Sequence, residues 1–153
     1  MNIKKIANLL LNFTINRIVE IFGLAIALAG LFLFVSLTSY SPNDPNFIFP
    51  ENTEINNLLG FQGSFISDLF LQSIGLVSYL VSITLTITGI NILKTKEFFL
   101  IIENIFFTIL YVILASIFLT YFYSNAFTLY INGNGGFVGN YFNETLLNSL
   151  INI

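Results

Sequence analysis

The sequence contains no cysteine and no histidine, and only 8% of its 153 residues are charged. It therefore has no disulfide, no thiol nucleophile, no imidazole base and none of the usual soft metal ligands. The net charge of -3 is too small to indicate a nucleic-acid-binding surface. No glycine-rich loop is followed by the lysine that a phosphate loop needs. We expect no catalytic residue, no bound cofactor and no metal site in this chain.

Hydrophobic residues are abundant instead, at 56% of the chain, and the mean hydropathy is +0.85. A soluble domain has about 25% charged residues, so this composition indicates a protein whose solvent is lipid. Three uncharged apolar runs, at about 21–40, 69–93 and 105–123, are each long enough to cross a hydrocarbon core of roughly 30 Å. The expected fold is an all-α polytopic membrane helical bundle, with three transmembrane helices and amphipathic helices at both termini.

The remaining segments divide into a leader, a loop and a tail around a membrane domain at 21–130. In residues 1–20, apolar residues recur at steps of three and four, which indicates a cytoplasmic amphipathic helix at the interface. A frayed polar leader is the alternative. Residues 41–68 form a polar outer loop. Residues 131–153 join a Gly-rich turn to an amphipathic tail, which we expect to lie on the membrane surface.

The distribution of basic residues predicts the orientation. All five lie within residues 1–17 or 94–96, two segments on the same side of a bundle whose first span goes out and second returns. Under the positive-inside rule, the N-terminus and the second connection are cytoplasmic. The loop at 41–68 and the C-terminal tail then lie on the outer side.

A row of small residues in the second apolar run predicts close helix packing, because small side chains let membrane helices approach. The row could be an interface between copies or packing within one bundle. It consists of Gly75, Ser78, Ser82, Thr86 and Gly89.

Two rival functions stay open at this stage. The same Ser/Thr-lined face could belong to a small transporter or channel subunit, although no ionisable residue lies in the middle of a predicted span. Glu103, near a predicted cytoplasmic end, could be the carboxylate of a membrane enzyme, although an interfacial Glu is more often simply solvated.

Three motifs in order suggest a family. Residues 39–47 read Ser-Tyr-Ser-Pro-Asn-Asp-Pro-Asn-Phe, an exit turn in which proline stops the helix. Residues 57–63 read Asn-Leu-Leu-Gly-Phe-Gln-Gly, and Asp68 precedes the second run. A Gly-Gly-x-x-Gly element follows the third run. Together these motifs resemble the N-terminal four-span membrane domain of the FtsK/SpoIIIE DNA translocases, over nearly the whole chain.

The resemblance implies the membrane anchor and assembly domain of a hexameric, ATP-driven DNA translocase. Such proteins act in cell division and chromosome segregation at the septum of the bacterial inner membrane. The expected partners are the lipid bilayer, further copies of the chain and other division proteins. DNA and ATP would act only through a motor that is absent from this chain, so we expect no enzyme activity here. Three spans where the family has four indicate a chain truncated before its fourth.

Six residues of the outer loop are predicted to shape a partner-facing surface. Loop shaping without any partner is the alternative for each of them. They are Pro42, Asp44, Pro45, Gly60, Gly63 and Asp68.

Overall fold

A computed structural model describes residues 3–45, 54–124, 132–147 and 149, and its ordered elements are helical. The helices are α1 (Ile3–Thr38), α2 (Gly60–Ile74), α3 (Val77–Thr95), α4 (Leu100–Phe122) and α5 (Gly136–Phe142), followed by a π-helical turn (Asn143–Leu147). Of the described helices, α1, α3 and α4 are long and apolar enough to cross a membrane. The predicted all-α membrane bundle with three such helices is confirmed.

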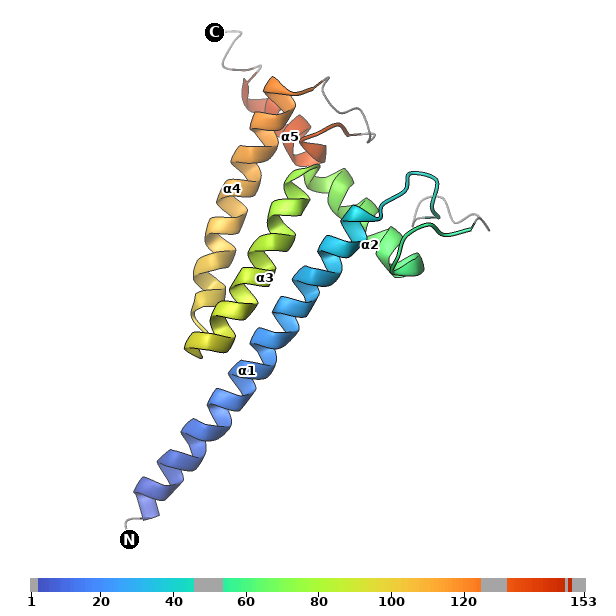
Figure 1. The fold of residues 1–153 in the computed structure, drawn as a ribbon. Helices are drawn as coiled ribbons and strands as arrows, with labels where there is room; N and C mark the ends of the chain where they lie inside the picture. The colour runs from blue at the N-terminus through green and yellow to red at the C-terminus, as the bar shows by residue number, and fades with distance from the viewer. Residues whose placement is uncertain (1–2, 46–53, 125–131, 148, 150–153) are drawn as a thin grey trace.

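The centre of the bundle is the antiparallel pair of α1 and α3, which lie side by side in Figure 1. Their backbones approach through small residues. A Cβ added to Gly30 of α1 would lie 2.5 Å from the backbone nitrogen of Thr86, and one added to Gly89 of α3 would lie 2.7 Å from the Cα of Ala27. The part of the predicted packing row from Ser82 to Gly89 therefore faces α1 of the same chain, as expected when dispersion rather than hydrophobicity drives helix contact.

The second apolar run is not one helix, although an uninterrupted span was predicted over 69–93. Gly75 has a φ of +61°, which ends α2, and α3 begins only at Val77. Residues 60–68, assigned to the outer loop, are the first part of α2. This helix crosses the end of α1 at an angle (Figure 1). The break falls at Gly75 because glycine adopts a positive φ without the steric cost of a Cβ.

The other helix ends also differ from the expected ones. α1 runs without a break from Ile3, so the predicted leader is the first part of the same helix as the first span. α3 ends where Lys96 takes a left-handed conformation, with a φ of 60°, and α4 starts at Leu100 rather than near residue 105. Glu103 is exposed in the first turn of α4 and does not interrupt that helix.

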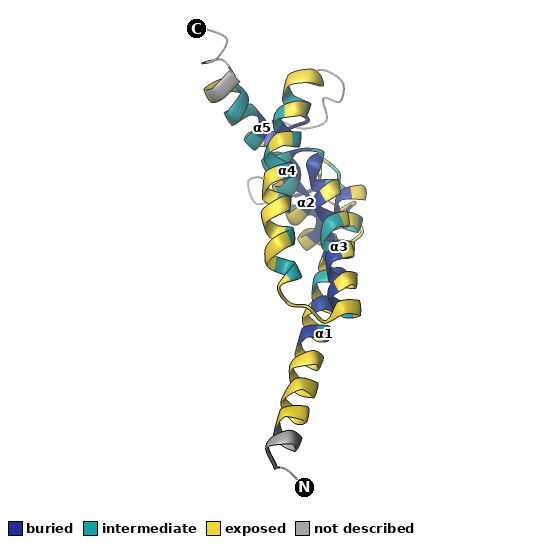
Figure 2. Ribbon diagram, turned by 90° about the vertical axis from the view of Figure 1, so that its left-hand side faces the viewer, coloured by how far each residue is buried: buried dark blue, intermediate teal, exposed yellow. Residues whose placement is uncertain are grey.

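The pattern of burial differs from that of a soluble protein, although Leu33, Leu37, Leu71 and Val81 form a small buried apolar cluster. Large apolar side chains are exposed along α1 and α4, whereas small polar residues lie inside. Much of both helices is accordingly yellow in Figure 2, the colour of exposed residues. The fully buried side chains include Ser64, Ser67, Ser78, Ser82 and Ser116. An exterior of this kind is stable when lipid surrounds it, which agrees with a membrane protein.

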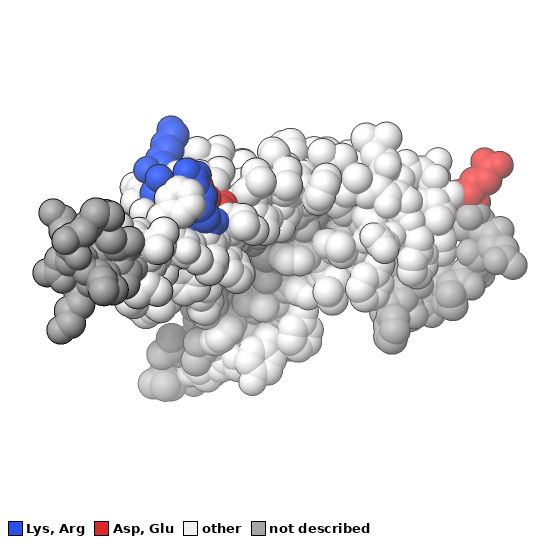
Figure 3. Space-filling view, turned by 90° about the horizontal axis from the view of Figure 1, so that it is seen from below, with Lys and Arg blue, Asp and Glu red and all other residues white. Residues whose placement is uncertain are grey.

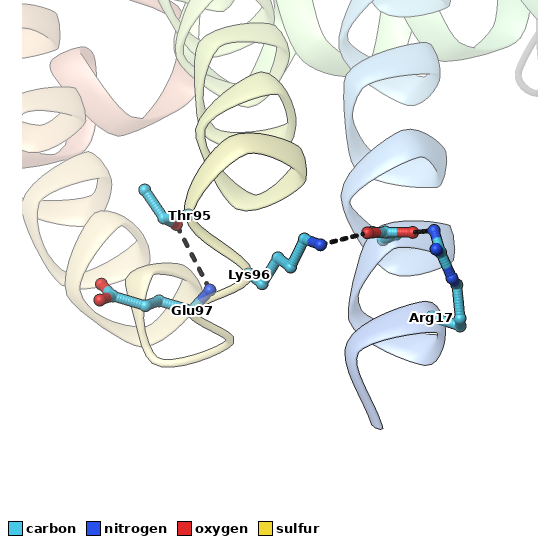
Figure 4. A network of polar contacts seen from close by, with 5 residues as sticks. Arg17, Thr95, Lys96 and Glu97 are labelled. Atoms are coloured by element: carbon cyan, nitrogen blue, oxygen red, sulfur yellow. Dashed lines mark hydrogen bonds and ion pairs between the residues drawn. The ribbon is translucent and has the colours of Figure 1, made fainter. Parts of the chain in front are cut away.

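An ion pair joins α1 to the turn after α3. Nζ of Lys96 lies 2.9 Å from Oε1 of Glu20, and Arg17 pairs with the same carboxylate (Figure 4). Figure 3, seen from this end, shows basic side chains gathered here. Asp44 lies at the opposite end, before the start of α2, and Asp68 lies within α2, bonded to Tyr40 just after α1. This distribution is the one on which the predicted orientation depends, and the orientation itself stays a prediction.

Candidate functional site

The segment that follows α1 is built around a buried carboxylate. Asp44 is only 4% exposed. Its Oδ1 accepts a hydrogen bond from the backbone N–H of Asn56 at 2.9 Å, and its Oδ2 accepts one from the N–H of Asn57 at 2.8 Å. Burying a carboxylate is costly unless charge-assisted bonds of this kind compensate for lost water. Asp44 thereby fixes the return of the chain toward α2.

Asn57 connects this turn to α1 and α2. Its Nδ2 donates to the carbonyl of Ser36 at 2.9 Å, and its Oδ1 accepts from the N–H of Leu59 at 3.0 Å. The hydroxyl of Ser36 in turn donates to the carbonyl of Gly63 at 2.5 Å. A buried amide needs partners at both ends, and here it has them. These bonds fix the start of α2 against the last turn of α1.

Two further bonds belong to the network. The hydroxyl of Tyr40 donates to Oδ1 of Asp68 at 3.0 Å, and that of Ser64 donates to the carbonyl of Pro45 at 2.9 Å. We call this network the loop cap. Its members are Ser36, Tyr40, Asp44, Pro45, Asn57, Gly63, Ser64 and Asp68.

The six loop residues predicted from the sequence take different places in the loop cap. Asp44, Pro45, Gly63 and Asp68 are buried, Gly60 is half-buried, and Pro42 is exposed. The four buried residues hold the loop from within. The surface beside them is formed by exposed residues such as Leu58, which is 77% exposed, and Phe61. Contact of this surface with a partner stays a prediction.

Tyr40 and Asn57 lie within the sequence motifs, whereas the sequence gives no role to Ser36 or Ser64. Both serines are buried and bond to backbone carbonyls of a neighbouring segment. Ser36 lies inside an apolar run and Ser64 inside an apolar helix, so only the fold shows what their hydroxyls contact.

A second built element joins the α2–α3 break to the Gly-rich turn. The N–H of Leu76 donates to the carbonyl of Asn134 at 2.9 Å. A Cβ added to Gly136 would lie 2.6 Å from the backbone nitrogen of Ile74, and one added to Gly75 would lie 2.7 Å from that of Gly136. Both glycines have positive φ angles. Backbone therefore packs on backbone at this point.

The same turn also packs on α4. A Cβ added to Gly139 would lie 2.5 Å from the carbonyl oxygen of Ser116, and one added to Gly135 would lie even closer to that oxygen. Nδ2 of Asn134 donates to the carbonyl of Tyr123. We call this contact the glycine junction: Gly75, Ser116, Asn134, Gly135, Gly136 and Gly139. The Gly-Gly-x-x-Gly element therefore holds α4 to the α2–α3 break.

The hydroxyls predicted to pack the second span bond within their own segment. Ser78 donates to the carbonyl of Gly75, Ser82 to that of Tyr79 and Thr86 to that of Ser82. Gly75 itself lies at the helix break rather than on α3. These hydroxyls are occupied and the row is closed by α1, so no observation favours a transporter or channel pathway along it.

An apolar groove of about 530 Å³ lies between α1 and α2, next to the loop cap. Its walls come from Ala29, Leu33 and Ser36 on α1 and from Gln62, Ile66 and Phe70 on α2.

Among the described residues, no three acidic side chains lie close enough together to hold a metal ion.

Comparison with known proteins supports the motif-based resemblance. The sequence model of the 4TM region of DNA translocase FtsK/SpoIIIE matches residues 16–153. The DNA translocase FtsK of Azospirillum brasilense is 37% identical over 73 residues, which cover 46% of this chain and 12% of that protein. The match thus spans about an eighth of the relative's length. No solved structure matches the chain.

Proposed function

The chain belongs to the family of the four-span membrane region of the FtsK/SpoIIIE DNA translocases, and we propose that it anchors and assembles a translocase of cell division. In this proposal it resides in the bacterial inner membrane, concentrates at the septum and serves chromosome partition. The observation that carries the proposal is the family match over 16–153, which includes the loop cap, the glycine junction, most of the first candidate span and all of the other two. The motor is assigned to another part of the protein.

The anchor works through packing and contact rather than chemistry. The α1–α3 pair forms the membrane stem, the loop cap fixes α2 across its end, and the glycine junction ties in α4. This arrangement presents exposed side chains such as Pro42, Leu58 and Phe61 on a rigid support, where we place contacts with other division proteins. Preorganisation of this kind lowers the conformational cost of binding. Further copies of the chain complete the proposed assembly.

The proposed orientation puts the basic end, with Arg17 and Lys96, in the cytoplasm and the loop cap outside. DNA and ATP then bind only to the motor, which lies in the cytoplasm with the chromosomal DNA. We propose no catalysis by the membrane portion, since the family match falls on the membrane region and not on a motor.

The test is the position of residues 1–153 in dividing cells of the encoding bacterium, followed with a fluorescent protein fused to the N-terminus. We expect a band at the septum. Phe61→Ser changes an exposed residue beside the loop cap and should weaken the band without changing membrane insertion, whereas Ile90→Leu, on the lipid-exposed side of α3, is the matched control. Uniform fluorescence around the membrane for the unmodified chain would refute the proposed recruitment.

A further inference from the structure

The first part of α1 extends beyond the rest of the bundle. The C-terminal end of α3 meets α1 at Glu20, where Lys96 forms its ion pair. Residues 3–19 continue past this level, away from α3 and α4 (Figure 1). About 17 residues at roughly 1.5 Å each give an overhang of roughly 25 Å. We call residues 3–19 the N-terminal overhang.

A straight α1 does not fit one bilayer. Its 36 residues span roughly 54 Å, whereas hydrocarbon core and headgroups together measure about 40–45 Å. The part of α1 beside α3, from Glu20 to Thr38, already covers roughly 28 Å and fills the hydrocarbon core. A membrane helix that exceeds the core tilts or kinks to accommodate the excess.

The overhang is nevertheless apolar over most of its circumference. Large side chains are strongly exposed along it, and the ribbon of lower α1 is yellow, the colour of exposed residues, in Figure 2. They are Leu9, Leu10, Leu11, Phe13, Ile15 and Ile18. A contiguous apolar surface of this kind in water marks an interaction site.

The asparagines of the overhang lie on one narrow face, whereas Thr14 and Arg17 lie on the opposite side. Asn8, Asn12 and Asn16 follow each other at steps of four, and the same face continues through Val19 and Gly23 at steps of three and four. Val19 is buried and Gly23 packs on α3. The asparagine face therefore points toward the side of α1 on which α3 lies, but below the point where α3 ends.

The opposite face continues the lipid-exposed side of α1. Leu10 and Phe13 lie in one row with the exposed residues Ile21, Leu24 and Leu28, again at steps of three and four. Arg17 interrupts this row at the level of the ion pair with Glu20. The overhang thus carries a lipid-compatible face in phase with that of the span.

We propose that in the bilayer the N-terminal overhang turns away from α3 near Glu20 and lies on the lipid surface of the membrane. Turning in this direction moves the face that pointed toward α3 into water and brings the opposite face onto the lipid. The asparagines are then hydrated, and Leu10 and Phe13 insert among acyl chains. Lys4 and Lys5 belong to the same segment and favour anionic headgroups. The proposal does not depend on the translocase role.

The chain contains no tryptophan, so single substitutions report on their own position. Leu10→Trp and Asn12→Trp are matched probes, two residues apart on opposite faces, and both sites are exposed. The full chain is reconstituted in vesicles of phosphatidylcholine and phosphatidylglycerol. We expect brominated acyl chains to quench Leu10→Trp at least several-fold more strongly than Asn12→Trp, and aqueous iodide to show the reverse preference.

Each other pattern overturns the proposal. Strong iodide quenching at both positions means that the overhang projects straight into water. Strong quenching of both by brominated acyl chains means that it is embedded across the membrane. Weak quenching of both by either agent means that protein, such as a second copy, covers it. Circular dichroism of both variants checks that the helical content of the chain is retained.

Discussion

Replacing Gly75 by alanine tests whether backbone contact at the glycine junction holds the bundle together. A left-handed φ of +61° costs a residue with a Cβ about 1–2 kcal/mol. The added Cβ would also lie 2.5 Å from the carbonyl carbon of Asn134 and 2.7 Å from the nitrogen of Gly136, both backbone atoms that cannot rotate away. Overpacking typically costs a further 1–3 kcal/mol. We expect a total loss of about 2–5 kcal/mol.

Gly133→Ala is the matched control for this substitution. Gly133 has a φ of +69°, but nothing lies within 4 Å of an added Cβ, so only the backbone cost applies. The assay is reversible unfolding in mixed micelles of dodecylmaltoside and increasing sodium dodecyl sulfate, followed by circular dichroism. The difference between the two variants isolates the packing contribution. Equal losses in the two variants would show that the contact between Gly75 and the Gly-rich turn contributes nothing, and the junction would then be an incidental proximity.

The other predictions concern the loop cap and the α1–α3 pair. Asn57→Leu leaves the carbonyl of Ser36 and the N–H of Leu59 without their side-chain partner and should cost about 1–3 kcal/mol in the same unfolding assay, whereas exposed Asn43→Ala should change little. A loss no larger than that of Asn43→Ala would contradict the network. Gly89→Leu forces α3 away from Ala27 and Gly23, so it should lower the free energy of unfolding by about 1–3 kcal/mol or more. The control Ile87→Leu, on the lipid-exposed side of α3, should leave the free energy of unfolding nearly unchanged. If Gly89→Leu unfolds like the unmodified chain, α1 and α3 do not pack through small residues.

The sequence predicts the class of fold well because the signal is additive. Hydropathy accumulates over about 20 residues, so three runs identify three membrane-crossing helices even where their ends are uncertain. The spacing of Ser82, Thr86 and Gly89 likewise predicts a packing face, since a helix repeats regularly. The choice of α1 as its partner comes only from the fold.

The helix break at Gly75 escapes prediction for a physical reason. A positive φ at one residue changes neither hydropathy nor charge, and glycine within membrane helices is common. What requires the break is the approach of Asn134 and Gly136, which lie 59 and 61 residues further along the chain (134 − 75 and 136 − 75). Tertiary contacts of this kind have no local signature.

The loop cap was predicted only in part. Pro42 and Pro45 predict a helix end because proline fixes φ and favours turns, and Asp44 is one of the few charged residues in an apolar chain. Its burial under the N–H groups of Asn56 and Asn57 depends on how the loop returns to α2. Local sequence therefore located this site, whereas the contacts that hold it together required the fold.

The orientation of the chain tests the anchor account most directly. A translocase motor acts on chromosomal DNA in the cytoplasm, so the anchor must have its basic end on that side of the membrane. The sequence has no cysteine, so Asn43→Cys and Glu97→Cys each provide a single exposed label at opposite ends of the bundle. Intact spheroplasts are treated with a membrane-impermeant maleimide, with and without permeabilisation. The account predicts that Asn43→Cys reacts in both conditions and that Glu97→Cys reacts only after permeabilisation. Labelling of Glu97→Cys in intact spheroplasts would contradict it.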